Sequence, residues 1–234
     1  MTRLLLVFTI LFSLVSYGQT ESVTLKESAK SLDELIPKDW ELLDSKTGDL
    51  NKDGITDLVF AIANTDEKNL KPNDGYGIGL IDQNPRKLGI YFGTPSGTFK
   101  KQLVSNEFII LQETPAMDEP FNGFTISKKG VLDINFHIWY SAGSWSTSNH
   151  TYKFRFQNNS FVLIGYDSNE AHRASGETTD YSINFLSKKM KITKGNFSED
   201  KPESVEWSNI YLEKLFTIKT LKKPFELEFE GMML

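Results

Sequence analysis

The clearest pattern along the chain is an alternation of apolar and polar side chains over residues 131–139. The apolar positions are Leu132, Ile134, Phe136 and Ile138, and the polar ones include Asp133, Asn135 and His137. A period of two residues is typical of a β-strand that buries one face and exposes the other. Lys128, Lys129 and Gly130 precede this segment and separate it from residues 124–127, which predicts a hairpin.

Short apolar segments separated by turn-forming residues continue this pattern over most of the chain. They predict strands at 78–81, 87–92, 99–104, 108–111, 151–156, 161–166, 181–186, 190–193, 210–216 and 225–229. Short strands joined by turn residues at this spacing favour antiparallel pairing. The sequence therefore predicts a mainly β fold, an antiparallel meander that forms a sandwich, a barrel or a partial propeller-like sheet.

Two segments near the N-terminus depart from the alternation. Residues 58–63 are apolar without a break, which predicts a strand buried on both faces. Residues 26–36 place Leu32, Leu35 and Ile36 on one side of a helix, and Pro37 would end it. We therefore expect a short N-terminal helix before the sheet.

The first residues are typical of a secretory signal peptide. Arg3 gives a positive charge, residues 4–15 are almost wholly apolar, and small residues follow at Ser16 and Gly18. The apolar run is shorter than the roughly 20 residues that span a bilayer, although an uncleaved anchor helix is the alternative. The sequence predicts a signal peptide over 1–18 and one β-rich domain over 19–234. The mature protein would lie in the periplasm or outside the cell, with no membrane span.

Composition narrows the class of protein. Hydrophobic residues make up 39% and charged residues 24%, which suits a soluble globular protein. The formal net charge is -5 and no block of Lys or Arg is present, which argues against nucleic acid as a partner. The chain has no cysteine, so disulfides, thiolate nucleophiles and cysteine zinc sites are excluded. A bound cation is one way to add stability to an exported protein without disulfides.

Residues 48–58 carry the one motif with defined chemistry, the pattern D-x-N-x-D-G-x-x-D that starts at Asp49. Calcium takes about six to eight oxygen ligands, and side chains at alternate positions point inward as a loop curls around the ion. Gly54 allows the sharp turn that this path needs. The predicted Ca²⁺ ligands are the side chains of Asp49, Asn51, Asp53 and Asp57 and the backbone carbonyl of Ile55. The alternative is an Asp- and Asn-rich turn that binds nothing.

The loop differs from an EF-hand. The twelfth position counted from Asp49 is Phe60, where an EF-hand requires glutamate, and the residues after Asp57 are strand-like. Residues 48–62 instead resemble one FG-GAP or VCBS-type repeat, the calcium loop of integrin-like β-propeller blades. This resemblance implies a loop followed by a strand and a structural calcium ion. We find a single copy, whereas a propeller needs several blades.

The remainder of the chain, especially residues 131–166, resembles uncharacterised secreted bacterial proteins that pair one such loop with a β-meander. That resemblance implies no activity. Within it, residues 139–145 are aromatic and small. Trp139, Tyr140 and Trp145 either form a platform for a protein or carbohydrate partner or cover the core at the end of a long hairpin.

Groups that can act in catalysis are scattered along the sequence. The candidates are the histidines His137, His150 and His172, the serine Ser144 and the carboxylates of Glu113, Asp118 and Glu119. The histidines lack metal-ligand spacing, and the serine does not lie in a G-x-S-x-G motif. The sequence favours an exported, calcium-binding, non-enzymatic β-domain that binds a partner protein or envelope carbohydrate. The alternative hypothesis is a secreted or periplasmic hydrolase of envelope or extracellular polymers.

Overall fold

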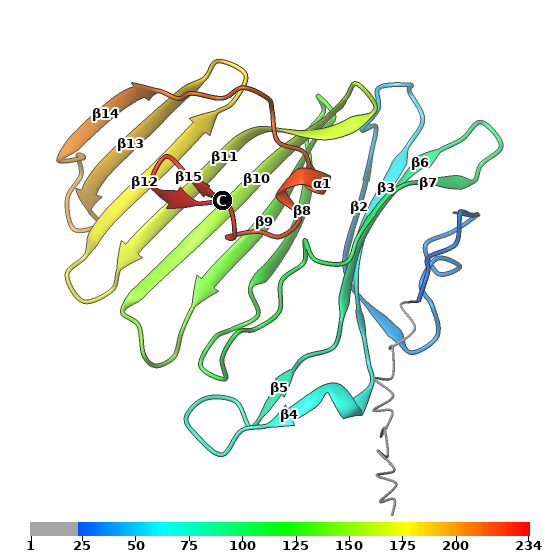
Figure 1. The fold of residues 1–234 in the computed structure, drawn as a ribbon, viewed down its shortest axis with the longest axis horizontal. Helices are drawn as coiled ribbons and strands as arrows, with labels where there is room; N and C mark the ends of the chain where they lie inside the picture. Colours follow the sequence, from blue (N-terminus) through cyan, green and yellow to red (C-terminus); the bar gives the residue numbers. More distant parts are fainter. Residues whose placement is uncertain (1–22) are drawn as a thin grey trace, which may run out of the picture.

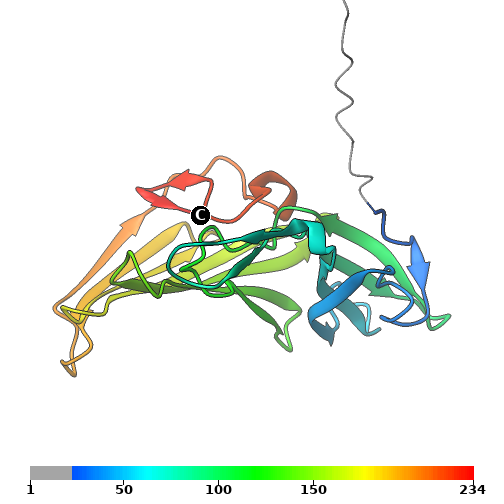
Figure 2. The ribbon, with the colours of Figure 1, turned by 90° about the horizontal axis from the view of Figure 1, so that it is seen from below.

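The computed structural model describes residues 23–234, so the predicted signal peptide lies outside the described residues. Two antiparallel sheets lie side by side and together form an arch (Figures 1 and 2). The predicted mainly β, antiparallel architecture is confirmed. In this part of the chain no helix is both long and apolar enough to cross a membrane.

The larger sheet has seven strands, each paired with its neighbour in sequence. They are β8 (Phe121–Ile126), β9 (Val131–Trp139), β10 (Ser146–Gln157), β11 (Ser160–His172), β12 (Glu177–Asn184), β13 (Lys189–Asn196) and β14 (Ser204–Asn209). The sheet curls like half of a barrel (Figure 2). Residues 131–139 form β9 as the alternation predicts, because every second side chain is buried.

The smaller sheet has five strands in the order β1, β7, β6, β3, β2. They are β1 (Ser28–Ala29), β2 (Trp40–Gly48), β3 (Asp57–Asn64), β6 (Arg86–Gly93) and β7 (Phe99–Ser105). The unbroken apolar run forms β3, and both of its faces are buried as predicted. Val59 and Ala61 join one hydrophobic cluster, and Leu58, Phe60 and Ile62 join another on the opposite face.

Short elements complete the fold. A 3-10 turn η1 (Glu67–Asn69) leads into a two-stranded ribbon of β4 (Leu70–Pro72) and β5 (Leu80–Asp82). Near the C-terminus lie α1 (Ile218–Leu221) and the two-residue strands β15 (Glu228–Phe229) and β16 (Met232–Met233). This last segment lies across one face of the seven-stranded sheet (Figure 1).

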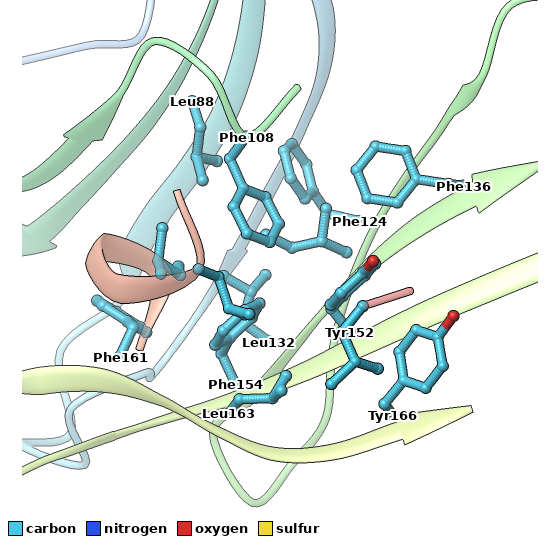
Figure 3. Packing of buried hydrophobic residues seen from close by; sticks show 14 of the residues in the cluster. Leu88, Phe108, Phe124, Leu132, Phe136, Tyr152, Phe154, Phe161, Leu163 and Tyr166 are labelled. Atoms are coloured by element: carbon cyan, nitrogen blue, oxygen red, sulfur yellow. The ribbon is translucent and has the colours of Figure 1, made fainter. Parts of the chain in front are cut away.

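Aromatic side chains fill the main hydrophobic core. The ring of Phe108 lies edge-on to Tyr152 and Phe154, with centroid separations of 5.7 and 5.5 Å (Figure 3). The C-terminal segment closes this core, since Ile218 of α1 and the last residue, Leu234, are buried in the same cluster. The cluster includes residues of both sheets, so one core holds the two sheets together.

The helix expected over residues 26–36 does not form. Ser28 and Ala29 instead pair with β7, and residues 32–36 make a single turn in which Leu32 accepts the N–H groups of Leu35 and Ile36. The apolar residues of this segment pack onto the outer face of the five-stranded sheet. A short segment with one apolar side gains that burial without a continuous helix, which at this length is marginal in any case.

Two predicted strands are also wrong. Residues 108–111 and 210–216 are irregular, yet Phe108, Ile109, Ile110, Ile210 and Leu212 are buried in the core. Both segments are irregular connections whose apolar side chains enter the core. One connects the two sheets, and the other follows β14. Periodicity in a short apolar run does not distinguish such a connection from a strand. Conversely β2 and β14 are strands that the pattern did not predict, because neither contains a fully buried residue.

Candidate metal loop

The loop with the D-x-N-x-D-G-x-x-D pattern connects β2 to β3. Those strands pair directly, with Gly48 opposite Asp57, so the loop is the turn of a hairpin. Lys52 and Gly54 have φ angles of 64° and 83°, in the left-handed region. Gly54 adopts this conformation without steric cost, and the two positions together curl the chain back on itself. A strand, not a helix, follows the loop, as the sequence predicts.

Asp57 anchors the end of the loop from inside the protein. Its side chain is fully buried, and one carboxylate oxygen accepts the N–H groups of Leu50 and Asn51 at 2.7 and 3.2 Å. The other oxygen accepts the N–H of Gly93 at 2.9 Å. The first residue of β3 thereby ties the start of the loop to the end of β6.

The remaining side chains point their oxygens at the loop backbone. Asp49 and Asn51 both accept the N–H of Asp53, at 3.2 and 3.0 Å, and Asp49 also accepts that of Gly54 at 3.0 Å. The side chain of Asp53 accepts the N–H of Ile55 at 2.8 Å and receives the Asn51 amide at 2.9 Å. The structure thus gathers all five predicted residues on one turn.

The loop carries three aspartates and one basic residue, Lys52. Among the ion pairs of residues 23–234, none includes Asp49, Asp53 or Asp57. Burial raises the pKa of the Asp57 carboxyl, the three backbone N–H groups lower it, and the charge of Asp53 raises it further. Three carboxylates in nine positions repel each other, and a cation is the group that would relieve this repulsion.

The base of the loop lies where the two sheets meet. Leu50 is 1% exposed and belongs to the main core. Gly130, in the turn between β8 and β9, is so close that a side chain there would lie 2.7 Å from the Asp49 carbonyl oxygen. Gly48 likewise faces Ile126 of β8. The loop therefore packs against the turn and strand of the seven-stranded sheet that lie nearest to it.

The donor set fits a hard cation. Carboxylate, amide and carbonyl oxygens are the ligands of Ca²⁺, and each oxygen that accepts one N–H keeps a second lone pair. In the described part of the chain, no group of three or more His, Cys, Asp or Glu side chains is arranged to hold a metal. The predicted site also relies on Asn51 and on the Ile55 carbonyl, which are outside that set of residue types.

No family model, curated protein or solved structure matches this chain.

The candidate catalytic residues are held in separate structural contacts. His150 is buried and uses its two ring nitrogens on Tyr166 and Ser148, at 2.7 and 2.8 Å, rather than on Ser144. His137 lies 3.2 Å from the Thr147 hydroxyl, and His172 lies 2.9 Å from that of Ser175.

Of the three candidate carboxylates, Glu119 forms a two-pronged ion pair with the buried Arg86, at 2.6 and 2.7 Å. Arg86 also donates to the Ile110 carbonyl at 2.8 Å. Asp118 donates its backbone N–H to the Trp139 carbonyl, and Glu113 donates its own to the sulfur of Met117. Glu119 therefore holds the connection between the sheets in place, and these contacts give no carboxylate pair facing a common point.

Arg173 organises the aromatic stretch, which the sequence did not predict. Its guanidinium lies over the Trp139 ring at 4.9 Å and donates to the carbonyls of Tyr140 and Ser144 at 2.9 and 2.6 Å. Trp145 is 65% exposed at the tip of this hairpin. Arg173 therefore occupies one face of the Trp139 ring, whereas Trp145 is open to solvent.

A larger polar surface lies on the seven-stranded sheet, opposite the core. Register places the outward residues of β9 to β14 side by side, and we call this set the polar face. It comprises Asn135, His137, Asn149, Thr151, Asp167, Asn169, Asp180, Ser182, Lys191, Thr193 and Trp207. The alternation in each strand is visible in the sequence, but the alignment of the strands is not, so this surface was missed.

Proposed function

We propose that this protein is an exported, non-enzymatic β-domain that holds one Ca²⁺ in the loop from Asp49 to Asp57 and binds a partner protein or envelope carbohydrate. The observation that carries the calcium proposal is a single turn that holds three carboxylates and one amide, with none of these carboxylates in an ion pair of residues 23–234. The observation that gives the ion a purpose is the position of this turn between the two sheets.

In this proposal Asp49, Asn51 and Asp53 supply side-chain oxygens and Ile55 supplies its carbonyl. Asp57 contributes through a carboxylate that already binds three backbone N–H groups, so its first role is to position the loop. Bound calcium would neutralise the loop charge and release the oxygens of Asp49 and Asp53 from the backbone N–H groups they now accept. The resemblance to a single FG-GAP or VCBS-type repeat agrees with this role.

Export supports the same proposal. The predicted signal peptide would carry the protein to the periplasm or outside the cell, where calcium is abundant and loops of this kind bind weakly. The ion would then stabilise the fold of a protein without disulfides rather than act as a signal.

Isothermal titration with CaCl₂ tests the ion directly. We expect one site per chain with a dissociation constant of about 10⁻⁴ to 10⁻³ M, in the range of extracellular modules. Asp53→Asn removes one charged ligand without burying a new group, so we expect at least tenfold weaker binding, about 1.4 kcal/mol. Asp74→Asn, in the exposed loop between β4 and β5, is the matched control and should bind as the unmodified protein does. Binding that is unaffected by Asp53→Asn would contradict the assignment.

A further inference from the structure

The polar face is a continuous surface that no other part of residues 23–234 covers. The C-terminal segment lies on the apolar side of the seven-stranded sheet, and the sheet curls away from it, so the polar face is on the inside of the curl (Figure 2). Antiparallel partners share a face. One row of partners therefore crosses the sheet from Asn135 through Thr151, Asp167, Ser182 and Lys191 to Trp207.

Polar side chains of this face bond to one another, and one of these contacts is an ion pair. Lys153, beside Thr151 on β10, forms an ion pair with Asp167, which also accepts the Ser182 hydroxyl at 2.7 Å. The Asn169 amide donates to Asp180. Thr151 donates to Asn135 at 2.9 Å. The result is a lattice of fixed donors and acceptors without a dominant charge, which matches a neutral, hydroxyl-rich ligand better than a polyanion or polycation.

A hollow lies in the middle of this face. It is a shallow depression that is widely open to solvent, with a volume of about 340 Å³, and its lining includes Asn149, Thr151, Asp167, Asn169, Asp180 and Ser182. These residues belong to three adjacent strands, β10, β11 and β12. Adjacent strands lie about 4.8 Å apart, so an extended ligand that crosses them meets a polar side chain at each strand.

Trp207 ends the row on the edge strand β14. Its side chain is 67% exposed, and the Lys191 ammonium lies 6.0 Å from the ring centroid. An exposed tryptophan beside a polar surface is the usual anchor of a binding site, because it offers a large rigid apolar area. The flat apolar side of a sugar ring has the shape and chemistry to stack on it.

We propose that the polar face binds a linear, neutral polysaccharide, which runs across β10 to β14 and stacks on Trp207. This inference deepens the proposed binding function and rests on it. A polyanion is disfavoured because Asp167 and Asp180 lie in the hollow. A peptide strand would use the unpaired edge of β14 rather than the face of the sheet. A second copy of the chain would need a more apolar centre than this face offers.

Native gel electrophoresis through embedded polymers tests the proposal. The gels contain hydroxyethyl cellulose, laminarin or dextran as neutral polymers, or polygalacturonate as an anionic one. We expect at least one neutral polymer to retard the protein. Trp207→Ala and Asn169→Ala should each weaken that retardation at least about tenfold, the size expected for an anchor residue. Tyr211→Ala is the matched control, because Tyr211 is 78% exposed beside the C-terminal segment rather than on the polar face.

Either of two gel results would overturn the proposal: no retardation by any neutral polymer, whether or not polygalacturonate retards the protein, or retardation that survives both variants. A dimer in sedimentation velocity that Trp207→Ala dissociates would also overturn it, since a second copy would then occupy the face. Calcium titration of the same preparation separates the two proposals. Calcium binding without retardation would contradict only the polysaccharide proposal. Retardation without calcium binding would contradict only the calcium proposal.

Discussion

Replacing Asp57 with alanine is expected to lower the free energy of unfolding by about 2 to 4 kcal/mol. The change leaves the buried backbone N–H group of Leu50 and the part-buried N–H groups of Asn51 and Gly93 without their acceptor. A buried group left unsatisfied costs about 1 to 3 kcal/mol, and a part-buried group costs less because water can reach it. Because these groups belong to the loop and to the end of β6, the loss weakens the junction of the sheets as well as the hairpin. Urea unfolding in EDTA measures the effect without any contribution from bound metal.

The control for this experiment is Asp53→Ala in the same buffer. Asp53 is exposed and serves only its own turn, so its loss should cost less than about 1 kcal/mol without calcium. The loss of stability in Asp57→Asn should lie between these two values. Asparagine keeps one carbonyl acceptor, but its NH₂ group would face backbone N–H groups that need an acceptor. Equal costs for Asp53→Ala and Asp57→Ala would show that the buried carboxylate does not anchor the loop.

Acidification is expected to destabilise the protein through His150. Burial, with a smaller contribution from His137, lowers the pKa of this imidazole from 6.5 to about 4. The folded state therefore holds the neutral ring, whereas the unfolded state takes up a proton below pH 6.5. The contribution of the neutral His150 ring to the free energy of unfolding is fully present above pH 6.5 and is lost as the pH falls toward 4. The loss amounts to about 3 kcal/mol, at about 1.36 kcal/mol for each pH unit.

Urea unfolding at intervals between pH 8 and pH 4 measures this slope. His150→Gln keeps a donor and an acceptor for Tyr166 and Ser148 but does not titrate. As the pH falls, the unmodified protein should therefore lose more stability than the variant. At pH 8 both side chains are neutral in both states, and that comparison isolates the cost of the substitution itself. A difference that stays constant from pH 8 to pH 4 would contradict the burial of a neutral imidazole.

The sequence predicted those strands whose burial alternates or is complete. In β9 every second residue enters the core, and in β3 both faces are covered, so local pattern and tertiary environment agree. Phe108 shows where this agreement ends. It lies at the centre of the core on an irregular connection, and its apolar neighbours produce the same short run that a strand would.

The candidate site likewise has a part that the sequence predicts and a part that it does not. The loop from Asp49 to Asp57 is local in sequence, so its residues could be named from spacing alone. The anchoring of Asp57 by Gly93, the contact of the loop with Gly130 and the role of Arg173 depend on residues far away in the chain. The polar face depends on the register of six strands, and no local pattern contains that information.

Thermal unfolding with calcium and then with EDTA tests the central claim that an ion in this loop stabilises the folded protein. An ion that binds only the folded state adds about 2.7 kcal/mol at a hundredfold excess over its dissociation constant. For a chain of this length the melting temperature should rise by roughly 5 to 10 °C. The rise should disappear in Asp53→Ala and persist in Asp74→Ala. An unchanged melting temperature at about 100 mM calcium, a hundredfold excess over the weakest dissociation constant expected, would contradict the account and would leave residues 49–57 as a turn that Asp57 alone holds in place.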